Sequence, residues 1–336
     1  MRVFVAGATG AIGKRLVPML VAGGHDVVAM TRSASKVDDL RSAGAVPVVA
    51  DALDREAVLE AVAGARPDVV VHQLTALAGA GSLRRFDAEF AETNRLRTVG
   101  TDYLLEAAVA GGARRFVAQS YAGWPYARDG GPVKTEDDPL DPDPPKPMRQ
   151  TLAAIRYLED AVLGAGGLDG VVLRYGGFYG PGTSVAEDGS IMEMVRRRRF
   201  PIVGEGSGVW SFVHIDDAAA ATALAVENGA PGIYNIADDE PAPVQEWLPV
   251  LAAAVGARPP RRVPAALGRL LAGEAGVLLM NEARGASNAK AKAELGWRLR
   301  YPTWRRGFAE GLAAGVAGRP EVASAHDAAA HRRSEG

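Results

Sequence analysis

Three glycines near the start of the chain are spaced so that the backbone between them could approach a phosphate group. They lie in the segment Gly7-Ala8-Thr9-Gly10-Ala11-Ile12-Gly13, which follows the apolar run Val3–Ala6 and leads into a helical pattern. A glycine turn permits close approach to a pyrophosphate, and the free N–H groups that begin the next helix attract an anion. The third glycine allows helix and strand to pack closely. This order of strand, turn and helix predicts a dinucleotide site.

The end of the second expected strand bears on which dinucleotide binds. An NAD site usually carries an acidic residue about 20 residues beyond the turn, where it binds the ribose hydroxyls. The segment Val28–Ser33 contains no acid, and it places Arg32 just after the strand. The planar guanidinium donates two hydrogen bonds to a phosphate at once, and Ser33 and Lys36 could assist. We therefore expect NADP(H) rather than NAD, the alternative being that Arg32 is an exposed residue at a helix start.

The composition excludes several classes of function. The chain has 336 residues, 48% of them hydrophobic, with a net charge of −2 and no cysteine. That length suits one large domain or two coupled ones, and the near-neutral charge favours neither a nucleic-acid nor a membrane partner. Without cysteine there can be no disulfide framework, zinc–thiolate site or cysteine nucleophile. We expect a small-molecule substrate and no metal site, and we leave the assembly open, with a homodimer as one candidate.

The two ends of the chain and its most apolar stretch indicate a cytoplasmic protein. The apolar run after Met1 is too short for the core of a signal peptide, and it leads directly into the glycine turn. The stretch Ala218–Val226 is much shorter than a membrane span. Residues 319–336 are rich in alanine, histidine and arginine without apolar periodicity, so we expect a flexible tail.

The first half of the chain alternates short β-rich runs with longer helical patterns. The expected strands are Val3–Ala6, Asp26–Met30, Val46–Ala50, Val69–His72, Phe116–Gln119 and Gly170–Arg174. The expected helices lie near Ile12–Ala22, Ala34–Ser42, Arg55–Val62 and Phe86–Ala110, with another beginning near Met148. This alternation predicts an α/β fold with a Rossmann-like, doubly wound parallel sheet.

The second half is less regular and is expected to contribute most of a substrate-binding region. Residues 1–176 are assigned to the dinucleotide-binding domain, which also receives segments near 211–236, and residues 177–318 to the smaller C-terminal region. Helices are expected near Ser190–Arg199, Ala218–Glu227, Val244–Val255 and Ser287–Leu295, and strands at Ser211–Ile215 and Gly232–Ile236. The proline-rich segment 126–147 excludes regular structure, and it is either a loop that covers the site or a surface loop.

Several motifs resemble, in order along the chain, the short-chain dehydrogenase/reductase family, in particular its extended and atypical branches of epimerases and dehydratases. Besides the glycine turn, they are Asp51-Ala52-Leu53, His72-Gln73-Leu74-Thr75, Asn94 with Gly100-Thr101, Leu173–Gly182, Phe212–Ala218 and Tyr234–Ile236. The resemblance implies that Asp51, Ala52 and Leu53 lie beside the adenine and that Gln73, Leu74 and Thr75 lie along the cofactor. It also implies cofactor contacts for Asn94 and for Tyr175 and Phe178, beneath the nicotinamide. Asp51 could instead cap a turn, and His72, His214, Tyr234 and Phe212 read more simply as structural residues.

The chain departs from the family in its expected catalytic helix. The family places a tyrosine and, four residues later, a lysine on one face of that helix, where the cation lowers the tyrosine pKa. Alignment on Glu159 puts Thr151 and Ile155 at those two positions, and Tyr157 is followed by Ala161. We therefore expect this chain to lack the usual catalytic pair.

The remaining candidates for chemistry follow the fifth strand. Ser120 stands where the family carries a serine or threonine that binds the reacting oxygen, and the adjacent Tyr121 is our preferred proton donor. Tyr179, Lys146 and Arg149 are the other candidates for that role. Tyr121 could also be a packing aromatic beside Trp124.

Three functions remain open. The first is an NADP(H)-dependent oxidoreductase acting on a small carbonyl or hydroxyl compound, which the cofactor turn and Ser120 favour. The second is an epimerase or dehydratase that retains its cofactor. Trp210 weakens it, because it stands near where nucleotide-sugar enzymes carry an arginine and indicates an apolar wall, although the run 196–199 could bind an anion. The third is a non-catalytic NADP-binding regulator, suggested by the missing pair.

Overall fold

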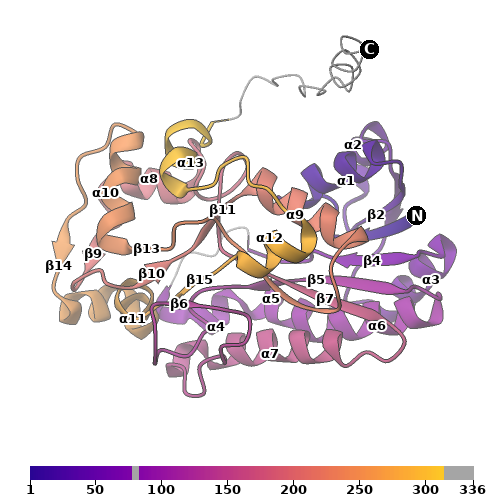
Figure 1. Ribbon diagram of the computed structural model, residues 1–336, viewed down its shortest axis with the longest axis horizontal. Helices are drawn as coiled ribbons and strands as arrows, with labels where there is room; N and C mark the ends of the chain where they lie inside the picture. The colour runs from indigo at the N-terminus through magenta and orange to yellow at the C-terminus, as the bar shows by residue number, and fades with distance from the viewer. Residues whose placement is uncertain (78–82, 314–336) are drawn as a thin grey trace, which may run out of the picture.

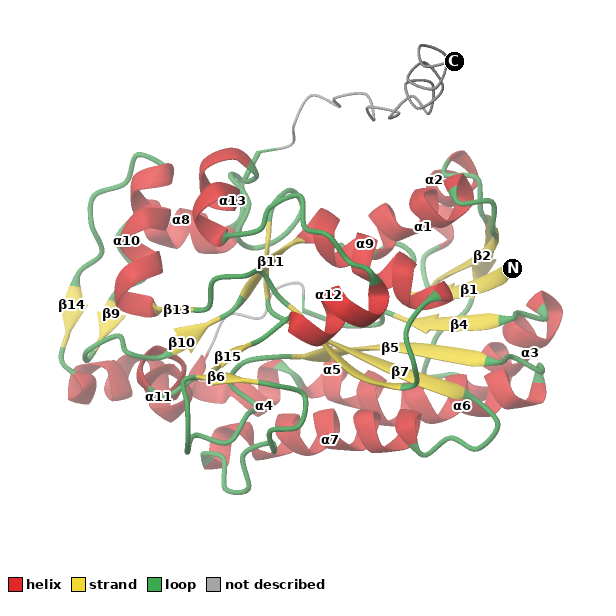
Figure 2. Ribbon diagram, in the orientation of Figure 1, coloured by secondary structure: helices red, strands yellow, loops and turns green. Residues whose placement is uncertain are grey.

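A seven-stranded parallel sheet forms the centre of the protein (Figures 1 and 2). The computed structural model describes residues 1–77 and 83–313, and its sheet order is β12-β7-β5-β4-β1-β2-β3. The strands are β1 (Arg2–Ala6), β2 (Asp26–Thr31), β3 (Val46–Val49), β4 (Val69–His72), β5 (Arg115–Tyr121), β7 (Asp169–Tyr175) and β12 (Gly232–Ile236). Successive strands proceed outward on either side of β1, so a crevice is expected at the carboxyl ends of β1 and β4. The predicted Rossmann-like, doubly wound fold is confirmed.

Helices cover both faces of the sheet because its central strands are apolar on both sides. One face packs against α1 (Gly13–Ala22), α2 (Val37–Ser42), α9 (Ile215–Glu227) and α12 (Ala289–Leu295). The other packs against α3 (Arg55–Ala65), α6 (Thr101–Ala110) and α7 (Arg149–Leu163). A short 3₁₀ turn, η1 (Ala34–Lys36), precedes α2. Two separate hydrophobic cores result, one on each side of the sheet.

The expected long helix at Phe86–Ala110 is divided into several segments. It comprises α4 (Phe86–Glu89), α5 (Ala91–Arg95), a π-helical turn η3 (Leu96–Gly100) and α6, and it follows the 3₁₀ turn η2 (Leu83–Arg85). A π turn adds one residue to a helical turn and is often found at functional sites. The helix α7 packs against α4, α5, η3 and α6. It runs parallel to them, because Thr151 near its start bonds to Asp87 and Tyr157 further along bonds to Asp102.

The C-terminal region has its own hydrophobic core, in which Trp247, Trp304, Phe308 and Tyr179 are buried. Its helices are α8 (Ser190–Arg196), α10 (Val244–Ala254), α11 (Ala265–Asn281) and α13 (Trp304–Glu310). Its short strands are β8 (Gly177–Tyr179), β9 (Ile202–Val203), β10 (Val209–Trp210), β11 (Phe212–His214), β13 (Ala242–Pro243), β14 (Arg262–Val263) and β15 (Gly285–Ala286). Neither α11 nor α13 was predicted from the sequence. Gly273, with φ of 72°, kinks α11.

The proline-rich segment 126–147 is mostly irregular, but the prediction that it excludes regular structure was wrong in one place. A short strand β6 (Val133–Lys134) pairs with β15, and the 3₁₀ turn η4 (Lys146–Met148) leads into α7. Arg128 pairs with Asp141 at 3.0 Å, which ties the segment to itself. The expected tail at 319–336 lies outside the described residues. Within residues 1–77 and 83–313, the helices are all too short or too polar to cross a membrane.

Candidate cofactor and active site

The glycine turn has the geometry that close backbone packing requires. Gly7 has φ of 91°, and a Cβ on it would lie 2.6 Å from the carbonyl oxygen of Gln73, so the turn after β1 passes directly against the chain after β4. A Cβ on Gly13 would lie 2.3 Å from the Gly7 carbonyl oxygen, which only a glycine can avoid. Gly10, in contrast, is exposed, and a Cβ on it would lie 3.3 Å from the Gly7 carbonyl oxygen.

The start of α1 leaves backbone donors available. Lys14 N–H donates to the Gly10 carbonyl at 3.0 Å, but the N–H groups of Ala11, Ile12 and Gly13 have no backbone acceptor among the described residues. Together with the exposure of Gly10, these donors fit a pyrophosphate. Thr9 also lies at the turn, with its hydroxyl 3.5 Å from that of Thr31.

Arg15 fastens the glycine turn to the C-terminal half of the chain. Its guanidinium donates to the Ala11 carbonyl at 3.1 Å, to the Pro181 carbonyl at 2.6 Å and to the Asp216 carboxylate at 2.5 Å. Arg15, which lies in the helix α1 that follows the turn, therefore links the turn to two distant segments. Pro181 follows β8 and Asp216 follows β11. The sequence gave no reason to select Arg15.

The adenosine end of the expected site lies at the carboxyl ends of β2 and β3. Arg32 is 71% exposed and pairs with Glu92 at 2.8 Å, so a 2′-phosphate would compete with a carboxylate for it. The Asp51 carboxylate accepts the N–H of Leu53 at 3.0 Å, which is the turn-capping role weighed above, and Ala52 is buried. Whether Asp51 also meets adenine remains a prediction.

The segment after β4 lies beside the turn, as the resemblance implies. Gln73 is buried, and its amide donates to the Tyr175 hydroxyl at 3.2 Å, while its side-chain oxygen has no partner among the described residues. Leu74 and Thr75 are partly buried next to it. Leu74 N–H donates to His72 Nδ1 at 3.2 Å, and the other ring nitrogen of His72 lies 3.1 Å from Thr101 Oγ1. Burial lowers the pKa of His72 to about 4, so this imidazole is neutral and structural.

The two aromatic residues expected beneath the nicotinamide belong partly to the core. The Tyr175 hydroxyl lies 2.7 Å from that of Thr222, and its ring packs 5.3 Å from that of Phe178. Burial raises the pKa of Tyr175, and its hydroxyl already has partners in Thr222 and Gln73. Phe178 is partly buried and remains the more accessible of the two.

Ser120 is held in a buried ion-pair network. Its hydroxyl donates to Glu159 at 2.6 Å, and Glu159 accepts two hydrogen bonds from Arg174, at 2.8 and 2.6 Å. Burial alone would lower the pKa of Arg174, but its bonds to Glu159 hold it above the usual value. In this structure the Ser120 hydroxyl is therefore used by Glu159, and a contact between Ser120 and a reacting oxygen stays a prediction.

Tyr121, the next residue, is the candidate that lines a cavity. The cavity lies between the carboxyl end of β5 and the C-terminal region, with Trp124, Trp210 and Leu279 among its walls. It measures about 10 Å³, which is about the room one water needs, so an organic substrate requires these side chains to move. Trp210 forms the apolar wall that the sequence indicated.

The other suggested proton donors lie elsewhere. Lys146 and Arg149 are exposed at the start of α7, where Arg149 pairs with Asp143 at 3.0 Å. Tyr179 is fully buried in the C-terminal core, and burial raises its pKa. His214 is also buried, with Nε2 3.0 Å from the Gly311 carbonyl, so it is structural as expected.

On α7, Thr151 and Ile155, the two residues that alignment on Glu159 places at the family's tyrosine and lysine, are buried. Thr151 donates to the Asp87 carboxylate at 2.7 Å and accepts from the Asn94 amide at 3.1 Å, while the Asn94 side-chain oxygen has no partner among the described residues. Ile155 packs in an apolar cluster that Tyr121 and Trp124 share. Asn94 is thus placed against α7, and a cofactor contact for it stays a prediction.

Arg97, in the π turn, is the residue that the sequence reading missed. It is only 6% exposed, and its Nη1 has no hydrogen-bond partner among the described residues. Burial lowers its pKa to about 10, against the opposing effects of Glu159 and Tyr121. A charged residue among the apolar neighbours Leu96 and Val99 was the available signal.

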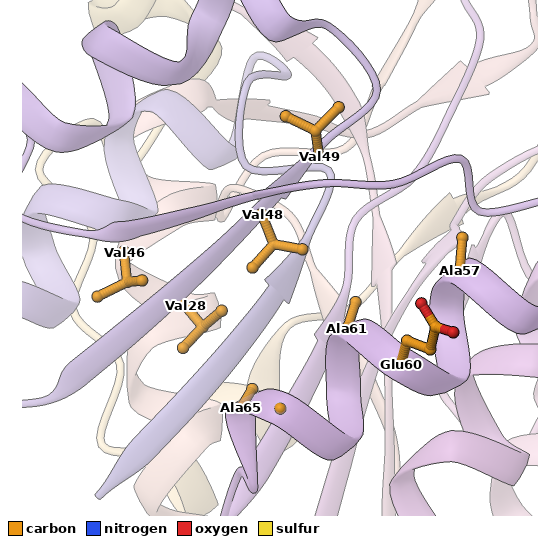
Figure 3. Close-up of a pocket in the computed structure, with 9 residues that line it drawn as sticks. Val28, Val46, Val48, Val49, Ala57, Glu60, Ala61 and Ala65 are labelled. Atoms are coloured by element: carbon orange, nitrogen blue, oxygen red, sulfur yellow. The ribbon is translucent and has the colours of Figure 1, made fainter.

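A second, wider groove lies away from these residues. It measures about 380 Å³ and lies between β2, β3 and α3, where Val28, Val46, Val48 and Ala61 line it (Figure 3). Its lining includes none of the glycine-turn residues and a single charged side chain, Glu60. We therefore locate the candidate site at the glycine turn and Tyr121.

Comparison with known proteins identifies the family of the chain. A model of the NAD dependent epimerase/dehydratase family matches residues 3–237. A 3-diazoavenalumate denitrifying reductase from a Streptomyces species is 50% identical over 311 residues, which cover 92% of this chain and 99% of that protein. A 2-alkyl-3-oxoalkanoate reductase from Stenotrophomonas maltophilia is 34% identical over 268 residues and covers 76% of each chain.

A solved structure extends the likeness to the whole fold. The Thermus thermophilus UDP-glucose 4-epimerase in complex with NAD superposes with a TM-score of 0.70 at 27% identity, covering 93% of this chain and 98% of that one.

Proposed function

Because the chain belongs to the NAD dependent epimerase/dehydratase family, we propose that it is an NADP(H)-dependent reductase of a small carbonyl compound. Two relatives, at 50% and 34% identity, are named as reductases, which supports a net transfer of hydride to substrate. The observation that carries the proposal is Tyr121, a phenol at the carboxyl end of β5 that lines a cavity with aromatic walls.

In this proposal the chain's own groups bind the cofactor and supply the proton. The N–H groups of Ala11, Ile12 and Gly13 hold the pyrophosphate, and Arg32 holds the 2′-phosphate. The bound nicotinamide supplies the hydride that forms the new C–H bond at the carbonyl carbon. The Tyr121 hydroxyl gives its proton to the carbonyl oxygen, and the phenolate that remains regains a proton from solvent.

The experiment is NADPH oxidation by the purified protein across a panel of 3-oxo acids, their esters and aryl ketones. Tyr121→Phe should lower kcat by about 10²- to 10⁴-fold, the usual contribution of a positioned acid. Tyr157→Phe is the matched control, because Tyr157 is exposed on α7 and donates to Asp102 at 2.7 Å. Full activity of Tyr121→Phe, or no turnover of any panel member, would refute the proposal.

The preference for NADP(H) has its own test. Arg32→Ala should weaken NADPH binding about ten- to hundredfold, the loss expected for a hydrogen bond to a charged group, and leave NADH binding unchanged. Glu92→Gln is the matched control, since it frees Arg32 from its present partner and should not weaken NADPH binding. Equal losses for both cofactors in Arg32→Ala would contradict the assignment.

The same measurements separate the two other functions. An epimerase or dehydratase would retain its cofactor through purification and show no net oxidation of NADPH, as the fold shared with the Thermus epimerase allows. A non-catalytic NADP-binding protein would bind NADPH but transfer hydride to nothing. Turnover that depends on Tyr121 would exclude both.

A further inference from the structure

Arg97 is a buried cation whose environment does not satisfy it. Its side chain is 6% exposed, and Nη1 has no partner within residues 1–77 and 83–313. Burying an arginine without a partner is costly, so such a residue is retained where something else requires its charge. It lies in the π turn η3, a distortion that is itself common at functional sites.

Two hydrogen bonds fix the level of Arg97 along α7. Asn94 donates to Thr151 at 3.1 Å, and Tyr157 donates to Asp102 at 2.7 Å. Since α7 runs parallel to α5, η3 and α6, the backbone of Arg97 lies between these two contacts. That interval on α7 holds Ile155, the position where the resemblance expects the catalytic lysine.

Arg97 forms no ion pair with its charged neighbours in the described part of the chain. Glu159 on α7 is the carboxylate with the strongest electrostatic effect on Arg97. Its oxygens accept hydrogen bonds from Arg174 on β7 and from Ser120. On β4, His72 is uncharged at neutral pH. The charge of Arg97 opposes the rise that burial causes in the pKa of Tyr121, which stands at about 12.

We propose that Arg97 replaces, from the neighbouring π turn, the cation that the family carries on α7, and that it stabilises the phenolate that Tyr121 becomes after giving up its proton. This inference rests on the proposed function. Tyr121 stands in for the family's tyrosine from β5, and Arg97 stands in for its lysine from η3. The pair is thus rebuilt from two elements that flank α7, while Thr151 and Ile155 of α7 are left to packing. Arg97 is a positioning residue, because it acts only through Tyr121.

The decisive experiment measures the acidity of residue 121 without requiring turnover. A fluorotyrosine, whose phenol is more acidic than that of tyrosine, is incorporated at position 121 and titrated by fluorine NMR in the full-length protein. Arg97→Gln should raise its pKa by about one to three, the range for an opposite charge nearby. Arg97→Lys should restore most of the original value. Arg95→Gln, at an exposed position two residues earlier at the end of α5, should leave the pKa unchanged.

An unchanged pKa in Arg97→Gln would overturn the inference. Kinetics supply the second readout: Arg97→Gln should lower kcat with little change in KM, whereas a selective rise in KM would make Arg97 a substrate anchor instead and also overturn it. Arg97→Gln should fold, because it breaks none of the hydrogen bonds that the described residues form. If Tyr121→Phe kept full activity, the proposed function would be refuted, whereas the effect of Arg97 on the pKa of residue 121 would still be measurable.

Discussion

Glu159 is the residue whose removal should most destabilise the protein. Its carboxylate accepts three hydrogen bonds of 2.6 to 2.8 Å, from Ser120 and from both sides of the Arg174 guanidinium, and the two charged side chains are each 4% exposed. Glu159→Gln preserves the shape but removes the charge. It leaves Arg174 buried without its counterion and removes the carboxylate that also acts on Arg97.

The expected loss follows from these contacts. Each of the two hydrogen bonds from Arg174 should contribute about 1.5–3 kcal/mol, because both are charge-assisted. Their sum agrees with the loss of about 3–5 kcal/mol that is typical when one partner of a buried ion pair is removed. Such a loss is a large part of a typical unfolding free energy of about 5–15 kcal/mol. Ser120→Ala, which removes one hydrogen bond, should cost less.

The assay is urea unfolding followed by far-UV circular dichroism, with the denaturant slope checked for constancy. Asp38→Asn is the control, since its ion pair with Arg41 is exposed on both sides and should contribute less than about 1 kcal/mol. Replacing both Glu159 and Arg174 with apolar residues of similar volume should recover most of the loss. If Glu159→Gln lowered the free energy of unfolding by less than about 1 kcal/mol, the reasoning would be refuted. A buried carboxylate with these contacts should contribute more stability than an exposed ion pair does.

Three further changes test other parts of the structure. Burial raises the pKa of Asp238 to about 8 from an unfolded value of about 3.9, so the wild type should lose stability as the pH rises from about 4 to about 8, and Asp238→Asn should remove that slope in Tm. Gly13→Ala places a Cβ 2.3 Å from the Gly7 carbonyl oxygen and should lower Tm and weaken NADPH binding in calorimetry, whereas Gly64→Ala, with open space around it, should keep or raise Tm. Asp54→Ala removes the carboxylate that caps α3 at 3.2 Å and should cost about 0.5–2 kcal/mol in urea unfolding; no loss would contradict the capping role.

The first half of the fold was predictable because its signals are local. Strand, glycine turn and helix follow one another from β1 to α1, and the apolar runs of β4 and β7 mark strands buried on both faces. The second half was less predictable, since β10, β13 and β15 are two residues long and acquire their meaning from partners far along the chain. Two residues are too few to show the alternation of apolar and polar side chains that marks a strand.

The candidate site also contains residues that local patterns predict and residues whose contacts lie far along the chain. The backbone donors at Ala11 to Gly13 follow from the glycine spacing, which is a local property. The commitment of Ser120 depends on Glu159, 39 positions away, and on Arg174, so no pattern around Ser120 reveals it. Arg97 escaped notice because its orientation depends on a π turn, and a helical pattern read at 3.6 residues per turn does not anticipate the additional residue.

That additional residue has a consequence for how this segment can change over evolution. Each residue of an α-helix advances the side-chain direction by about 100°, so a deletion of one residue within Leu96–Gly100 would turn α5 by about that angle relative to α6. Asn94 would then lose its hydrogen bond to Thr151, and a neighbouring residue would point in the direction that Arg97 now takes. Related chains of different length here are therefore out of phase with one another, and comparing them position by position across the turn would match residues that point in different directions.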